Sequence, residues 1–173
     1  MTLNLLKRLL LLFTAAILLA ACSSGRSNSQ SSSTLSTGTL PKPSISNSEI
    51  RNAYITLFDL SNPAIEPKVK VTQDGVQLQA AMKTAFGSSL SKAAGSATVV
   101  SVSLESKQAC LIADVTYPCA EVTYNLLTPT GSPIFTTPST GYAIYSGQKW
   151  LVAKNTVCSL LTLANNNRAP KGC

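Results

Sequence analysis

The chain has 173 residues and a mass of 18.1 kDa, and it carries 14 basic and 7 acidic side chains but no histidine. This length accommodates one domain of ordinary size with an appendage. Because histidine is absent, the sequence excludes protease triads with an imidazole base, zinc sites with imidazole ligands, and a histidine switch near neutral pH.

Residues 1–21 have the features of a bacterial lipoprotein signal peptide. Lys7 and Arg8 give the segment a positive start, and the apolar run over 9–19 is shorter than the about 20 residues that a membrane-spanning helix needs. The segment ends in Leu-Ala-Ala directly before Cys22, which resembles a lipobox. We therefore expect cleavage before Cys22, lipid attached to its thiol, and an extracytoplasmic protein held to the membrane by its acylated N-terminus. A plain secretory signal with an incidental cysteine is the alternative.

Residues 22–43 are rich in serine and threonine and contain almost no large apolar side chains. Such a segment buries too little apolar area to offset the entropy lost on ordering, so we expect a flexible tether. Its composition also admits O-glycosylation. The remaining residues, 44–173, are expected to form a single domain.

The first part of this domain has helical periodicity. Ser46 and Glu49 fit a capping box, and a second helix is expected between Asp74 as its N-cap and Gly87 after its end. A short further helix is expected over 88–94. The two apolar stripes with helical spacing consist of Ile50, Ala53, Tyr54, Leu57 and Phe58, and then of Leu78, Ala81, Met82, Ala85 and Phe86.

From Thr98 onward the apolar period changes to two, which predicts strands. Residues 142–153 are expected to form a hairpin with its turn over 146–149, and a short helix is expected over 157–164. The order of elements predicts an α+β fold, with two or three N-terminal helices packed on a curved four-stranded antiparallel sheet and a short C-terminal helix. The residues expected on the core face of the first two strands are Val100, Val102 and Leu104, and then Ala120, Val122, Tyr124 and Leu126.

The five cysteines divide into Cys22 and four in the domain. An even number in an exported domain indicates a disulfide framework with three possible connectivities. Of these we favour the two local bridges, Cys110–Cys119, which closes a hairpin-like excursion, and Cys158–Cys173, which fastens the C-terminus to the preceding helix. A metal site is the competing interpretation, but there is no CxxC pair and no histidine, so we expect no metal and no cofactor.

Five segments together resemble the low-molecular-weight secreted antigen family of mycobacteria and related actinobacteria. They are residues 52–63, 121–127, 140–143, 146–152 and 156–161. The resemblance covers about 45–173 and implies a cone-shaped, nuclear-transport-factor-2-like (cystatin-like) domain. It also implies an exported protein of the cell envelope, often a lipoprotein, with no catalytic residue to carry over. The excursion between Cys110 and Cys119 departs from the family pattern.

Few residues are candidates for chemistry. Asp59 and Asp114 have the least obvious structural role among the acids, and enzymes of the cystatin-like fold often pair an aspartate with a histidine, which is missing here. A solvated or capping role for both is favoured. The basic residues do not cluster on one face, so we expect no nucleic-acid partner.

Six aromatic residues fall on faces that converge between the helices and the sheet. They either fill the core, which is favoured, or line a pocket for an apolar ligand. These residues are Tyr54, Phe58, Phe86, Tyr124, Tyr142 and Trp150.

The leading hypothesis is a lipid-anchored protein of the cell envelope whose domain is a non-catalytic binding or structural module. One alternative is a carrier of a lipid or another small apolar ligand, held between sheet and helices. A second alternative is an enzyme of the isomerase or dehydratase kind. The sequence does not identify a protein partner or a ligand.

Overall fold

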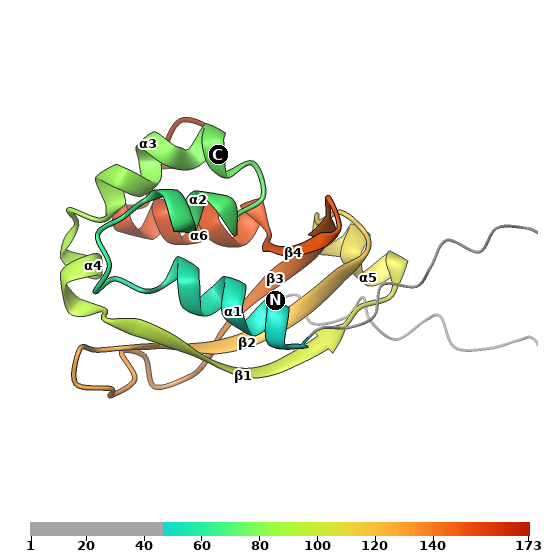
Figure 1. Cartoon of the computed structure of the whole chain (residues 1–173), viewed down its shortest axis with the longest axis horizontal. Coiled ribbons are helices and arrows are strands. Elements are labelled where there is room, and N and C mark those ends of the chain that lie inside the picture. The colour runs from blue at the N-terminus through green and yellow to red at the C-terminus, as the bar shows by residue number, and fades with distance from the viewer. Residues whose placement is uncertain (1–46) are drawn as a thin grey trace, which may run out of the picture. The chain divides into compact units, whose positions relative to one another are not determined.

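Four antiparallel strands form the sheet, and their spatial order, β1-β2-β3-β4, is also their order in the chain. The computed structural model describes residues 47–173 (Figure 1). Each strand therefore pairs with the next one, without a crossover. The strands are β1 (Ser96–Leu104), β2 (Cys119–Leu127), β3 (Ser139–Ser146) and β4 (Lys149–Val152).

The helices lie mainly on one face of this sheet. Helix α1 packs directly on the strands and contacts α2, while α3 lies farther from the sheet and packs on α2 and α6 (Figure 1). This arrangement confirms the α+β prediction of N-terminal helices on a curled four-stranded antiparallel sheet with a C-terminal helix. The helices are α1 (Asn47–Leu57), α2 (Glu66–Lys70), α3 (Gly75–Ala85), α4 (Ser89–Ala93), α5 (Lys107–Ile112) and α6 (Lys154–Ala164).

The apolar stripes of the sequence become the main core. Ile50 and Tyr54 of α1 and Leu78 of α3 are fully buried, and they face Ala120 and Val122 of β2 across the core. Apolar residues at helical spacing on one side and at alternate positions on the other bury a continuous surface, and this burial is the main favourable term in folding.

A second, smaller core lies on the opposite face of the sheet. It contains the Cys110–Cys119 bridge together with Val115, Ile144 and Ala153. Successive residues of a strand point to opposite faces, so Ile144 belongs to this cluster while its neighbour Ala143 belongs to the main core. Both faces of β3 are therefore covered at this point.

The excursion between the first two strands is not the simple hairpin extension that we expected. It contains helix α5, whose N-cap Ser106 accepts a hydrogen bond from the backbone N–H of Ala109 at 3.1 Å. A serine three residues before that donor is a typical start signal for a helix. The favoured bridges are present, with Cα–Cα distances of 6.0 Å for Cys110–Cys119 and 5.5 Å for Cys158–Cys173.

The core face of β1 differs from the prediction at Val100. A β-bulge between Val99 and Ser101 leaves Val100 without a partner on β2, and its side chain is 51% exposed. Before the bulge, Ala97 and Val99 are buried. An extra residue reverses the alternation of faces, so the expectation that Val100 shares the inner face was wrong. The backbone carbonyls of Val99 and Val100 accept hydrogen bonds from the guanidinium of Arg51 on α1.

Two features of the helical half also differ from the sequence-based interpretation. Asp74 is the N-cap of α3, but it has a left-handed backbone, with φ of 54°, and its side chain forms no capping hydrogen bond. Glu49 lies in the first turn of α1, where its Oε1 accepts a hydrogen bond from the backbone N–H of Trp150 at 2.9 Å. Glu49 therefore connects α1 to β4.

The expectations for the signal peptide over 1–21, the tether over 22–43 and the lipid on Cys22 lie outside the described residues. Within residues 47–173, no helix is long and apolar enough to cross a membrane.

Candidate functional site

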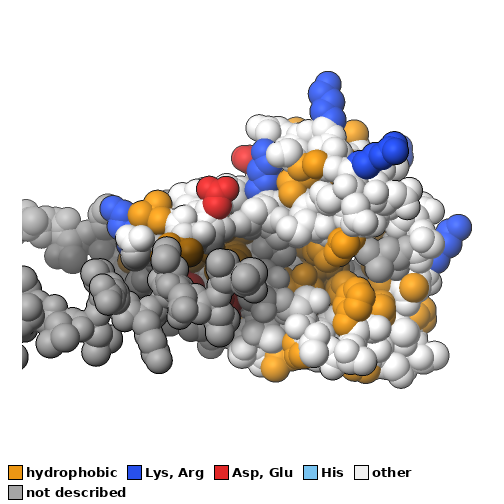
Figure 2. Space-filling view, turned by 180° about the vertical axis from the view of Figure 1, so that it is seen from behind, with side chains coloured by type: hydrophobic (Ala, Val, Ile, Leu, Met, Phe, Trp, Pro, Cys, Tyr) orange, Lys and Arg blue, Asp and Glu red, His pale blue; other side chains and the backbone are white. Residues whose placement is uncertain are grey.

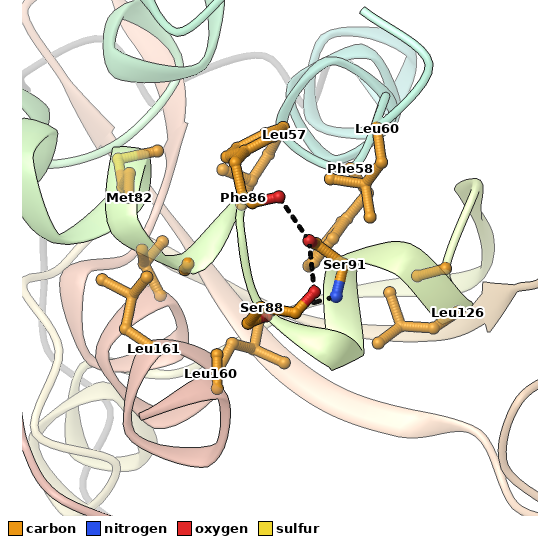
Figure 3. Close-up of a pocket in the computed structure, with 14 residues that line it drawn as sticks. Leu57, Phe58, Leu60, Met82, Phe86, Ser88, Ser91, Leu126, Leu160 and Leu161 are labelled. Atoms are coloured by element: carbon orange, nitrogen blue, oxygen red, sulfur yellow. Dashed lines mark hydrogen bonds between the residues drawn. The ribbon is translucent and has the colours of Figure 1, made fainter. Parts of the chain in front are cut away.

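An apolar hollow of the domain lies where the ends of several helices meet one strand. The end of α1, the end of α3, helix α4 and the C-terminal half of α6 surround it, and Leu126 of β2 contributes one wall (Figure 3). Its volume is about 90 Å³. The residues that line it are Leu57, Phe58, Leu60, Met82, Ala85, Phe86, Ser88, Ser91, Ala94, Leu126, Val157, Leu160, Leu161 and Ala164.

Several of the residues that line this hollow are small. Ala85 on α3, Ala94 after α4 and Ala164 on α6 present only a methyl group to it. Protein interiors are otherwise packed as densely as organic crystals, and side chains that line an unfilled hollow lack dispersion contacts on the side that faces it. A ligand with apolar groups would restore those contacts.

The polar atoms in the wall are already engaged with the backbone. Ser91 Oγ donates to the carbonyl of Phe86 at 2.6 Å and lies 3.0 Å from the carbonyl of Ser88, while Ser88 Oγ accepts from the backbone N–H of Ser91 at 3.3 Å (Figure 3). These bonds hold α4 against the end of α3. The hydroxyls are thereby withdrawn from the pocket, and the pocket presents an almost entirely apolar surface.

A second, larger hollow adjoins the apolar pocket. It has a volume of about 520 Å³ and shares Leu60, Phe86, Ser91 and Ala94 with it. In the space-filling view, hydrophobic side chains gather around a hollow on the face opposite to that of Figure 1 (Figure 2). The residues that line only the outer hollow are Ser61, Lys92, Gly95, Ser96, Thr128, Pro129 and Gly131, and four of them, Ser61, Lys92, Ser96 and Thr128, have polar side chains.

Phe86 separates the apolar pocket from a buried cation. The side chain of Lys68 on α2 is 1% exposed, and its Nζ lies 4.8 Å from the centre of the Phe86 ring. The same ammonium donates to the carbonyls of Asn62 at 2.8 Å and of Ala64 at 3.2 Å. Burial lowers the pKa of Lys68, and the nearby carboxylate of Asp59 partly opposes this shift. The cation is satisfied by carbonyls and an aromatic face, and it fixes the position of the ring.

Of the six aromatic residues singled out from the sequence, Phe58 and Phe86 line the pocket. Tyr54 and Tyr124 instead fill the main core, with ring centroids 5.1 Å apart, and Phe58 stacks on Tyr124 at 5.3 Å. Trp150 is also in the core, 2% exposed and 5.5 Å from the ring of Tyr145.

Tyr142 lies on the opposite face of the sheet, because its position on β3 has the other parity from the core residue Ala143. Its Oη is 3.4 Å from Oε2 of Glu121, and its pKa is raised by burial and by that carboxylate. Tyr142 therefore belongs to the wall of the second core and has no place in the pocket.

Neither candidate acid lines the apolar pocket. Asp59 closes the turn after α1 by accepting hydrogen bonds from Ser61 Oγ and from the backbone N–H of Asn62, and the bond from Ser61 holds its pKa below the usual value. Asp114 is exposed, has φ of 54°, and borders a surface groove beside α6. Capping and solvent exposure account for both residues.

Residues 47–173 contain no group of three or more side chains suited to hold a metal ion. Their four cysteines are all used in the two bridges. Cys22, the expected lipid attachment site, lies outside the described residues.

The chain matches no known family profile, no curated protein and no solved structure. The resemblance to the low-molecular-weight secreted antigens therefore stays a prediction, and the site itself carries the functional argument. Sequence reasoning missed the small residues that create the pocket. The signal for them was the presence of Ala85 and Ala164 on apolar helix faces where large residues dominate.

Proposed function

We propose that this protein is a membrane-tethered, extracytoplasmic binding module that holds an apolar group in the pocket between α3, α4 and α6. The observation that carries the proposal is the pocket itself, whose lining hydroxyls are engaged with the backbone and whose remaining surface is apolar. Pockets of this kind gain free energy from apolar ligands because little hydration has to be displaced from polar atoms.

The size of the pocket limits what it encloses. A cavity of roughly 150 Å³ accepts a benzene ring, and pockets that enclose a drug-sized ligand start at about 300 Å³. At about 90 Å³, the apolar pocket accommodates the end of a hydrocarbon chain or a single apolar side chain. A carrier that encloses a whole lipid is therefore less well supported than a module that grips one apolar end.

Location is supported by two independent features. The two disulfides are typical of proteins outside the reducing cytoplasm. The lipobox before Cys22 and the Ser/Thr-rich segment after it favour an anchored domain on a tether. Membership of the secreted antigen family would agree with both. Catalysis is not part of the proposal, since Asp59 and Asp114 both lie outside the apolar pocket.

The anchor is tested by feeding cells an alkyne-tagged fatty acid and detecting the tag on the protein. We expect labelling of the parent protein, loss of labelling for Cys22→Ala, and full labelling for Cys158→Ala as the control cysteine variant. Labelling that persists in Cys22→Ala contradicts the anchor at this position.

The pocket is tested on the membrane-bound protein with a diazirine–alkyne analogue of 1-decanol, a neutral chain that crosslinks on illumination. We expect peptides from α3, α4 and α6 to carry the label. Ala85→Phe places a ring in the pocket and should lower labelling about 10-fold or more, since 1.4 kcal/mol corresponds to a factor of ten.

Ala80→Phe is the matched control, because Ala80 lies on the same helix, is exposed and does not line the pocket. Labelling that spreads over the surface, or that survives Ala85→Phe, overturns the proposed binding function.

A further inference from the structure

The apolar pocket and the outer hollow adjoin each other and differ in chemistry. They share Leu60, Phe86, Ser91 and Ala94, so a ligand that reaches from one hollow into the other contacts these side chains. The inner part is apolar, and the outer part exposes hydroxyls, backbone and one ammonium. A bound molecule that uses both parts needs an apolar end and a polar end.

The charges around the outer hollow favour a negative head group. Lys92 on α4 is the charged residue among those that line it, its side chain is exposed, and it forms no ion pair with any residue between 47 and 173. No acid lines the outer hollow, and Asp59, two residues before the lining Ser61, has its carboxylate engaged with Ser61 Oγ and the backbone N–H of Asn62. The second cation near the shared wall is Lys68, behind the ring of Phe86.

The hydroxyls of the outer hollow contribute less to the choice of head group. Ser61 Oγ donates to Asp59, and Thr128 Oγ1 lies 2.9 Å from Thr130 Oγ1 and accepts the backbone N–H of Ser132. Lys92 therefore remains the strongest donor to an incoming group. An ammonium without a carboxylate partner attracts an anion, and the attraction is weakened by salt when the site is open to water.

The volumes favour one chain over two. The apolar pocket, at about 90 Å³, takes the end of one hydrocarbon chain, and the outer hollow, at about 520 Å³, has room for the rest of that chain and its head. A two-chain lipid would leave its second chain against the polar rim or in water.

We propose that the ligand is a single-chain anionic amphiphile of the fatty-acid class, with its chain end in the apolar pocket and its carboxylate at Lys92. This inference rests on the proposed binding function and specifies its ligand. Lys92 acts here as a binding residue that selects the charge of the head group, while the inner wall selects its tail.

The test uses three diazirine–alkyne probes with the same ten-carbon chain on the membrane-bound protein, namely the carboxylic acid, the primary alcohol and the trimethylammonium compound. For each probe, the concentration for half-maximal labelling is compared between variants and parent, so that partitioning of the probe into the membrane cancels. We expect Lys92→Gln to raise this concentration about 3- to 10-fold for the acid, as for a partly exposed charge contact. The alcohol should show no change.

Lys107→Gln removes a positive charge from α5, which borders neither hollow. It should leave the concentration for half-maximal labelling unchanged for all three probes. The parent should bind the acid more tightly at low salt than at high salt. The trimethylammonium probe should bind more weakly than the acid to the parent protein. Lys92→Gln should reduce the difference in half-maximal labelling concentration between these two probes.

The outcomes separate the two proposals. If the alcohol labels the pocket peptides but Lys92→Gln affects acid and alcohol equally, or the cation binds as well as the acid, the anionic ligand is refuted and the apolar binding site stands. If no probe labels the pocket peptides, the proposed function and the ligand class are both refuted.

Discussion

The core under α1 is filled, whereas the core between α3, α4 and α6 is partly empty, although both belong to the same face of one sheet. Under α1, the rings of Tyr54 and Tyr124 pack at a tilt with centroids 5.1 Å apart, and a Cβ added to Gly141 of β3 would lie 2.7 Å from Tyr54 Oη. In the other region, Ala85 and Ala164 face a space of about 90 Å³. The difference teaches that the size of the side chains, more than the path of the backbone, decides where this fold has room for a ligand.

The disulfide at the open region gives the largest expected effect. Cys158 of α6 is bridged to Cys173, and Gly172 beside it approaches Leu78 of α3, so the bridge holds the two helices that form pocket walls. Replacing both cysteines by alanine should lower the free energy of unfolding by about 3 kcal/mol, from the entropy of the released loop. Urea unfolding followed by the fluorescence of Trp150, the only tryptophan, measures this.

Hydrogen exchange of the variant that lacks the Cys158–Cys173 bridge compares the local stability of the two regions. We expect faster exchange in α6 and the end of α3 and little local change in β2. The Cys110→Ala, Cys119→Ala variant is the control, because it should cost slightly less stability and speed exchange in α5 instead. Equal exchange patterns for the two variants would contradict a local role for the bridges.

One substitution should have opposite signs in the two regions. Ala143→Leu adds three carbons at a fully buried position of β3, and should destabilise the protein by about 2 to 3 kcal/mol through overpacking. Ala85→Leu adds the same carbons at the pocket and should be neutral or stabilising by up to about 1 kcal/mol. Urea unfolding of both variants decides the comparison. A similar loss for both would mean that the pocket is closed in solution.

Gly141→Ala tests how tightly the filled region is packed. The added Cβ would lie 2.5 Å from Thr156 Cγ2, and we expect a loss of about 2 kcal/mol in the free energy of unfolding. Gly87→Ala is the control, because its nearest contact is 3.4 Å away and its change should be below about 0.5 kcal/mol. Adding Tyr54→Phe to Gly141→Ala should recover part of the loss, since it removes a clashing hydroxyl. If Tyr54→Phe recovers none of the lost stability, the clash with the Tyr54 hydroxyl is not its cause.

High pH should weaken the filled region selectively. Burial raises the pKa of Tyr124 to about 12, and burial also raises the pKa of Tyr54. A tyrosine whose pKa is raised by folding stabilises the protein fully below pH of about 10, and this stability is lost as the pH rises towards the folded pKa. For each of the two tyrosines, the free energy of unfolding should fall by about 1.4 kcal/mol per pH unit in this window.

The lowered pKa of Lys68 acts in the opposite direction, since stability rises with pH between its folded pKa and its unfolded value of 10.5. Urea unfolding at pH 9 and pH 11 measures the net slope. Tyr124→Phe should reduce the loss at pH 11, and Tyr117→Phe, at an exposed side chain, serves as control. An unchanged slope in Tyr124→Phe would contradict the raised pKa.

The sequence predicted the elements of the fold better than the site. Periodicity located α1, α3 and β2, because burial repeats every three to four residues or every second residue there. The short α2 was not predicted, since its segment has no apolar stripe. Val100 was assigned to the wrong face of β1, because a bulge reverses which face the following residues point to and the apolar pattern does not show it. Phe58 and Phe86, two of the six aromatic residues named from the sequence, line the pocket. The hollow is lined by residues that are distant in sequence, such as Ala85 and Ala164. A periodic pattern within one segment does not show which residues of other segments lie opposite it.

Both edge strands of the sheet carry contacts that hinder pairing with a strand of another molecule. Beside β4, the backbone of Val152 exchanges hydrogen bonds with Val71 and Gln73, at 2.8 and 2.9 Å. Beside β1, the bulge at Val100 interrupts the regular strand, and the guanidinium of Arg51 engages the carbonyls of Val99 and Val100. Exposed strand edges are templates for aggregation, so these contacts hinder the addition of a strand from another molecule at these positions.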